Sequence, residues 1–142
     1  MTFKTLLAAL LVLVTAGEWR VSHAAQACTQ ADAIAAETQA QATTWPDMYA
    51  SFRRYVQCDD GSVAEGFSNS VALLLSEHWD KIEELAKMGR AHHSFERFVL
   101  RHTDVTMTLD QANLIKRKAH DECPAGAKEL CGRILKRMDE FK

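Results

Sequence analysis

The chain has 142 residues, with 17 Lys and Arg against 19 Asp and Glu, which gives a net charge of −2 at pH 7. This mild balance argues against nucleic acid as the main partner, because nucleic-acid-binding surfaces are strongly basic. Beyond the first segment, no apolar run approaches the roughly 20 residues of a membrane-spanning helix. We therefore expect no membrane insertion of the mature chain.

The first 24 residues have the pattern of a cleavable signal peptide. A lysine near the start precedes an uninterrupted apolar run over Leu6–Ala16. That run has the length of a signal-peptide apolar region and is too short to cross a bilayer comfortably. Small residues mark two possible cleavage points, after Ala24 and after Ala27. We expect cleavage after Ala24, which leaves residues 25–142 as a single domain that is periplasmic or secreted.

The helical pattern dominates the rest of the chain, and strand patterns are nearly absent. Apolar residues recur at three- and four-residue steps, which places them on one face of a helix. In chain order, the expected helices cover about 29–43, 46–58, 62–75, 79–89, 95–102, 108–123 and 124–141. The sequence thus predicts an all-α fold, a compact bundle of six or seven short helices with two disulfides.

Several of these helices carry recognisable start signals. Ser62–Glu65 and Thr108–Gln111 both match the capping box, in which two side chains satisfy free backbone donors. Pro46 and Pro124 stand where a proline fits the first helical turn. The first helix is different, because Ile34 is its only substantial apolar side chain. Its packing is therefore weakly specified.

Four cysteines follow the signal peptide: Cys28, Cys58, Cys123 and Cys131. An even number in an exported chain predicts disulfides, because compartments outside the cytosol are oxidising. Cys28 and Cys58 lie at the two ends of a predicted antiparallel hairpin, and the other two flank a short turn between successive helices. Nearest-neighbour pairing, Cys28–Cys58 and Cys123–Cys131, is the simplest closure. The two crossed pairings stay open.

One short motif suggests chemistry. His120, Asp121 and Cys123 form an H-D-x-C sequence that resembles the active-site helix of secreted phospholipases A2, in which the histidine activates water and the aspartate helps to hold calcium. The likeness covers four residues. The paired cysteines that precede this motif in the family are replaced by residues 116–119, and there is no glycine-rich calcium loop. We expect His120 to be a polar residue on an exposed helix face.

The other polar groups are interpreted as structural. Asp59 and Asp60 precede Gly61 in a turn whose charge is favourable beside a helix N-terminus, and the spacing of an EF-hand is missing. His102 follows Phe95 by seven residues on an apolar stripe, which indicates a hydrogen-bonded core histidine. The histidines do not have the spacing that places two metal ligands on one helix face. No catalytic, cofactor or metal residue is predicted.

A second resemblance covers about 90 residues. Its elements are Cys58-Asp59-Asp60-Gly61, Glu65-Gly66-Phe67, residues 98–102 (FVLRH), Cys123-Pro124 and Leu130-Cys131. Their order resembles a group of small exported, disulfide-containing helical proteins of Gram-negative bacteria without assigned function. In layout only, the chain is similar to the periplasmic immunity proteins that neutralise amidase effectors of type VI secretion by plugging the active site. That likeness implies a periplasmic location and transfers no binding residues.

These observations favour a protein that binds another periplasmic or secreted protein, as an inhibitor or immunity-type partner, over an enzyme. The first alternative is a small envelope hydrolase that uses His120 and Asp121. The second is a structural or assembly protein. The sequence predicts neither the identity of the partner nor the oligomeric state.

Overall fold

The structure is a computed structural model that describes residues 27–103 and 106–140. The predicted signal peptide and the cleavage point after Ala24 lie outside these residues. Within them the chain forms seven α-helices and three short 3₁₀ turns, and no strand: α1 (Gln30–Gln39), α2 (Trp45–Tyr55), α3 (Gly61–Glu77), α4 (Ile82–Ala91), α5 (His93–His102), α6 (Leu109–Asp121) and α7 (Lys128–Asp139). None of the described helices is long and apolar enough to cross a bilayer.

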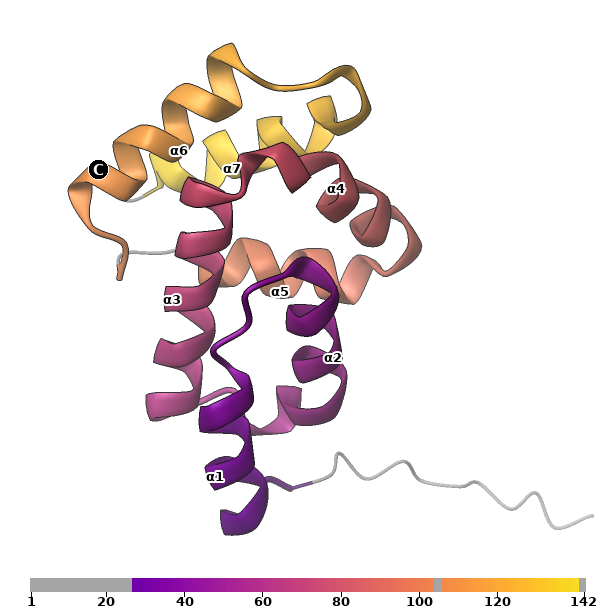
Figure 1. Cartoon of the computed structure of the whole chain (residues 1–142), viewed down its shortest axis with the longest axis vertical. Helices are drawn as coiled ribbons and strands as arrows, with labels where there is room; N and C mark the ends of the chain where they lie inside the picture. The colour runs from indigo at the N-terminus through magenta and orange to yellow at the C-terminus, as the bar shows by residue number, and fades with distance from the viewer. Residues whose placement is uncertain (1–26, 104–105, 141–142) are drawn as a thin grey trace, which may run out of the picture.

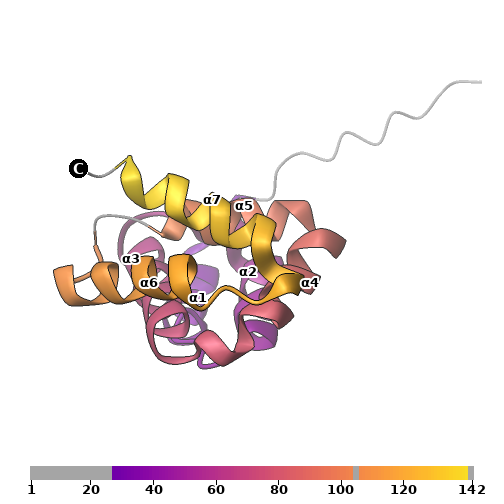
Figure 2. The same cartoon turned by 90° about the horizontal axis from the view of Figure 1, so that it is seen from above.

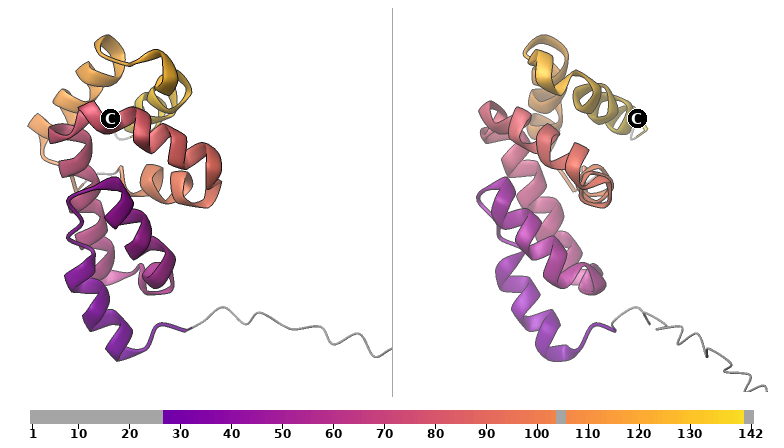
Figure 3. Two further views of the ribbon diagram at one scale, coloured as in Figure 1. Left: turned by 45° about the vertical axis from the view of Figure 1, so that its right-hand side comes forward. Right: turned by 90° about the vertical axis from the view of Figure 1, so that its right-hand side faces the viewer.

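Helix α3 is the spine of the molecule and packs against α1, α2, α5 and α6. Helices α1 and α2 lie along its first half, whereas α6 and α7 form the end of the molecule opposite α1 (Figure 1; Figure 3). Seen from above, α6 and α7 run side by side across that end (Figure 2). Helices α4 and α5 pack against each other as a hairpin beside α3. The all-α prediction is therefore confirmed.

Both predicted disulfides are present. Cys28 is bonded to Cys58 with Cα atoms 4.9 Å apart, and Cys123 to Cys131 with Cα atoms 6.3 Å apart. The first bond ties the start of α1 to the 3₁₀ turn Val56–Cys58 that follows α2. The second spans the turn between α6 and α7, including the 3₁₀ segment Ala125–Ala127.

An unbroken series of aromatic rings joins α2, α3 and α5. Tyr49 and Phe52 of α2 contact Phe95, with centroids 5.1 and 5.5 Å from its ring. Phe98 then contacts Phe52 at 4.9 Å and Phe67 of α3 at 5.0 Å. Offset and edge-on ring pairs add specific attraction to the burial of apolar area. This aromatic ladder therefore fixes the relative positions of three helices.

Helix α1 packs through small side chains rather than through its one large apolar residue. Ala36 and Ala40 are completely buried, whereas Ile34 is 62% exposed. A Cβ added to Gly66 of α3 would lie only 2.9 Å from the Ala40 Cβ, so the two helix backbones approach closely. The Ser70 hydroxyl donates a hydrogen bond to the Ala40 carbonyl oxygen at 2.6 Å. The weakly specified packing predicted for this helix thus depends on a glycine of its neighbour.

One of the two predicted capping boxes is wrong. Helix α3 begins at Gly61, and its N-cap is Asp60, whose carboxylate accepts a hydrogen bond from the Gly61 N–H. Gly61 has a φ of 52°, a conformation that glycine adopts without strain. The helix therefore starts before Ser62, and the Ser62 hydroxyl bonds the Glu37 carboxylate of α1 instead. The other box, at Thr108 and Gln111, is confirmed.

The helix ends differ from the predicted ones by a few residues. Helix α1 ends at Gln39, four residues earlier than predicted, and α2 gives way to a 3₁₀ turn at Val56. A 3₁₀ turn also precedes α4, and another follows Pro124 before α7 begins at Lys128. The predicted extension of the last helix to Phe141 lies outside the described residues. Helix ends commonly tighten into 3₁₀ turns, which sequence periodicity does not reveal.

Substitution by alanine is expected to have opposite effects on stability at two helical glycines, Gly66 and Gly132. Gly66→Ala forces the two backbones apart, so we expect the free energy of unfolding to fall by about 1–3 kcal/mol. Gly132→Ala, in α7, meets no atom within 4 Å. It should raise that free energy by about 0.5–1 kcal/mol, because alanine is the better helix former. Urea unfolding checks both, and a Gly66→Ala variant as stable as wild type would contradict the packing described.

Candidate functional site

The residues predicted from the phospholipase-like motif lie at the end of α6. The side chains of His120 and Asp121 are 78% and 64% exposed, and His120 Nδ1 lies 2.6 Å from Asp121 Oδ1. The expectation of an exposed polar histidine is confirmed. Cys123, the last residue of the motif, is held in a disulfide with Cys131. The structure therefore surrounds this pair with solvent, and the hydrolase alternative stays a prediction.

The predicted core histidine is the centre of a buried polar network. His102, in α5, is 3% exposed, and its Nδ1 lies 2.8 Å from the Ser68 hydroxyl of α3. Its Nε2 lies 3.1 and 3.2 Å from the two carboxylate oxygens of Asp59. Arg101 pairs with the same carboxylate. The network thus ties α3 and α5 to the residue that follows Cys58.

The environment of Asp59 favours its ionised form. Burial alone would raise the pKa of this carboxyl group. Hydrogen bonding and charge interaction with His102, and then with Arg101, outweigh that effect and lower the pKa below its ordinary value. We expected Asp59 to contribute its charge to a turn beside a helix N-terminus. Its side chain is 7% exposed and also serves as a buried anion for α5.

Ser68, His102 and Asp59 are also the residue types of a serine-hydrolase triad, but their arrangement differs. In such a triad the aspartate holds Nδ1 of the histidine and the serine hydroxyl contacts Nε2. Here Ser68 is on Nδ1 and Asp59 on Nε2. The Ser68 side chain belongs to a residue that is only 3% exposed. We therefore interpret the network as structural.

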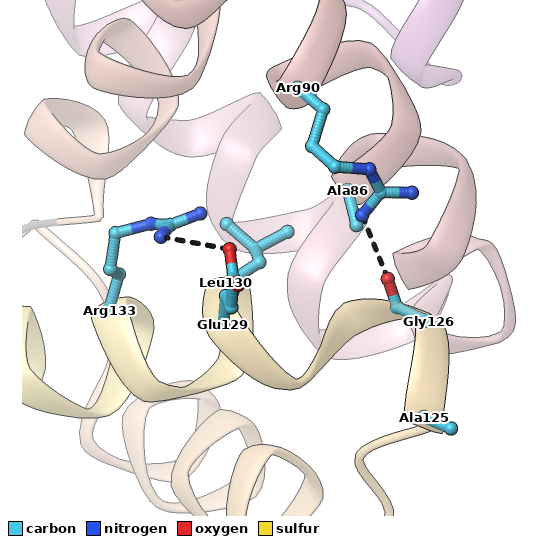
Figure 4. A pocket seen from close by; sticks show the side chains of 7 residues that line it. All are labelled: Ala86, Arg90, Ala125, Gly126, Glu129, Leu130 and Arg133. Atoms are coloured by element: carbon cyan, nitrogen blue, oxygen red, sulfur yellow. Dashed lines mark hydrogen bonds and ion pairs between the residues drawn. The ribbon is translucent and has the colours of Figure 1, made fainter.

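Two concave sites flank α4. The first, of about 290 Å³, lies against the start of α7 and includes Arg90, Gly126, Glu129 and Arg133 (Figure 4). Arg90 donates to the Gly126 carbonyl oxygen at 2.9 Å. Arg133 forms ion pairs with Glu96 at 2.8 Å and with Glu129 at 3.9 Å. The charged groups that line this pocket bond to one another or to backbone. We therefore interpret these interactions as structural contacts that hold α4 and the start of α7 together.

The second site, here called the α2–α4 groove, has a volume of about 440 Å³. It is lined by residues from the start of α2, the outer face of α4 and the turn before α5: Pro46, Tyr49, Glu84, Lys87, Met88, Ala91 and His92. Concave sites with an apolar floor and a few polar groups are the usual places for binding. The α2–α4 groove is our candidate functional site.

Tyr49 is the most strongly oriented side chain in the groove. Its ring stacks on His92 with centroids 4.6 Å apart and planes inclined by 22°. The ring also packs edge-on against Phe95 in the aromatic ladder and lies 6.3 Å from the Phe52 ring, centroid to centroid. The Arg53 guanidinium lies 5.9 Å from the Tyr49 centroid, within the range of a cation–π contact. The core thus holds Tyr49 in place, and the residue is half-buried.

Helical periodicity places Tyr49 on the apolar stripe of α2, together with Met48 and Tyr55, and does not distinguish it from them. Met48 and Tyr55 of that stripe are fully buried, whereas Tyr49 lies at the edge of the core. The spacing of the histidines gives His92 no role as a metal ligand. The half-exposed position of Tyr49 depends on how α4 and α5 approach α2, and no sequence signal shows that.

Comparison with known proteins gives no relative from which to transfer a role. No family model matches the chain, and no match was found among curated proteins or solved structures. The functional argument therefore depends on the residues themselves.

The lowered pKa of Asp59, which His102 and Arg101 cause, predicts a specific dependence of stability on pH. Because the pKa of Asp59 is lower in the folded state, its stabilising effect is complete above the unfolded pKa of about 4. It is lost as the pH falls through the folded pKa. We expect Asp59→Asn to cost about 2 kcal/mol at neutral pH and to flatten the decline below pH 4. Urea unfolding from pH 7 to acid checks this, and parallel curves would contradict it.

The exposure of His120 predicts that His120→Ala has little effect. We expect the free energy of unfolding to change by less than about 0.5 kcal/mol, as for most exposed substitutions. An essential general base would instead contribute about 10²–10⁴-fold to a rate. Assays of phospholipid and peptidoglycan hydrolysis with wild type and variant distinguish the two. Turnover by wild type that disappears in the variant would establish the hydrolase alternative.

Proposed function

We propose that this protein is an exported binding protein, of the inhibitor or immunity type, that docks on another periplasmic or secreted protein through the α2–α4 groove. The observation that carries the proposal is the half-buried Tyr49, whose ring is fixed by stacking on His92 and by the aromatic core behind it. A side chain that is oriented before binding loses little conformational freedom on binding.

The composition of the groove supports this role. Tyrosine, methionine and arginine are enriched in protein–protein interfaces, and tyrosine and arginine supply many of the residues that dominate binding energy. Tyr49 and Met88 line the groove from opposite helices, with Arg53 one turn beyond Tyr49. The groove thus combines an apolar floor with polar groups at its margin.

The disulfides support the proposed location. Both cysteine pairs are bonded, and no free cysteine remains among the described residues. Such bonds persist in oxidising compartments, which include the periplasm and the extracellular space. Together with the signal-peptide pattern of residues 1–24, they favour export.

The proposal predicts which substitutions weaken binding to the partner. Tyr49→Ala and Met88→Ala each remove a side chain from the groove, and we expect each to weaken the complex by about 1–3 kcal/mol, or roughly tenfold to hundredfold in Kd. To measure this, the mature protein is used to capture its partner from the periplasmic fraction. Calorimetry with the purified partner then gives the Kd of each variant.

The matched control is Asn113→Ala, an exposed residue of α6 outside the groove. We expect it to bind like wild type. Thermal unfolding of all three variants separates lost binding from lost folding. A folded Tyr49→Ala, Met88→Ala double variant with wild-type affinity would show that the groove is not the binding surface.

A further inference from the structure

The margin of the α2–α4 groove carries more positive than negative charge. Lys87 lines the groove from α4. Arg53 of α2 lies just beyond the lining residues, with its guanidinium 5.9 Å from the centroid of the Tyr49 ring. Glu84 is the one carboxylate among the residues that line the groove. The two permanent cations thus stand on the two helices that form its walls.

These cations are available to a partner. In the part of the chain that the structure describes, neither Arg53 nor Lys87 lies within ion-pair distance of a carboxylate. The pocket on the other side of α4 differs, because Arg133 there is bound to Glu96 through two nitrogens at 2.8 and 2.9 Å. A guanidinium offers five donors in a fixed plane, which suits a carboxylate.

We propose that the groove takes an acidic segment of the partner protein, with an apolar side chain on Tyr49 and Met88 and flanking carboxylates on Arg53 and Lys87. This inference rests on the proposed function and adds the chemistry of the partner. Complementary charges at the margin of an interface guide association and select among partners. Glu84 contributes one negative charge to the groove, which the two positive charges of Arg53 and Lys87 outweigh.

Three synthetic peptides with one apolar centre and different flanks test the partner chemistry: acetyl-Glu-Glu-Leu-Phe-Glu-Glu amide and its Gln- and Lys-flanked counterparts. Amide NMR shifts of the oxidised mature protein report where and how tightly each binds. We expect the acidic peptide to shift the groove amides, including those of Met88 and Ala91. Its Kd should be about three- to tenfold lower than that of the Gln peptide, the range that two exposed ion pairs give, and should rise with salt.

A charge-reversal pair supplies the control. In the Arg53→Glu, Lys87→Glu double variant we expect the Lys-flanked peptide to bind best. The Lys128→Glu, Lys136→Glu double variant makes the same change in net charge on α7 and should keep the preference for the acidic peptide. If both variants reverse the preference equally, net charge alone is responsible and the inference is wrong.

The remaining outcomes separate this inference from the proposed function. Equal binding of all three peptides in the groove would overturn the acidic partner and leave the groove as a binding surface. The absence of groove shifts with every peptide would also overturn the inference. The proposed function itself fails if the folded Tyr49→Ala, Met88→Ala variant binds the partner with wild-type affinity.

Discussion

The structure depends on the aromatic ladder that connects its surface to its buried polar network. At the surface end of the ladder, Tyr49 stacks on His92, and the ladder continues through Phe95 and Phe98. At its other end, Phe98 contacts His102 of the buried polar network, with ring centroids 4.4 Å apart. Close-packed interiors transmit strain because they contain few voids. The position of the Tyr49 ring in the α2–α4 groove is therefore set by the same contacts that hold α2, α3 and α5 together.

The polar network and the first disulfide fix the far end of this ladder. His102 is held by Asp59, and Asp59 directly follows Cys58, which is bonded to Cys28. A buried ion pair contributes modestly to net stability, but removing one partner leaves an uncompensated charge. The network therefore specifies how α5 docks on α3. In contrast to these fixed contacts, Arg53, Lys87 and Glu84 at the α2–α4 groove form no ion pair within the part of the chain that the structure describes.

The sequence was sufficient for the features that depend on local pattern. Helical periodicity predicted the elements, the order of helix ends predicted the pairing of Cys28 with Cys58, and the apolar stripe predicted a buried His102. The Ser62 capping box failed because Asp60 and Gly61 offer an earlier start to the same helix. Local patterns cannot rank two adjacent starts when neither requires a tertiary contact.

Features that join distant segments were not predictable. The Asp59 carboxylate meets a histidine 43 residues later in the chain. The groove brings Tyr49 of α2 beside Met88 and His92, which depends on the packing of three helices. Periodicity shows which face of a helix is apolar, but it does not show where the edge of the assembled core falls.

The central claim is that a partner docks in the α2–α4 groove, and site-specific photo-crosslinking in the native compartment tests it most directly. A photoreactive phenylalanine derivative replaces Ala91, which lines the groove, or Asn113, which lies on α6. The account predicts a single crosslinked protein from position 91 whose crosslinked peptide is acidic, and none from position 113. A crosslink to the same protein from position 113 alone would place the interface elsewhere and contradict the account.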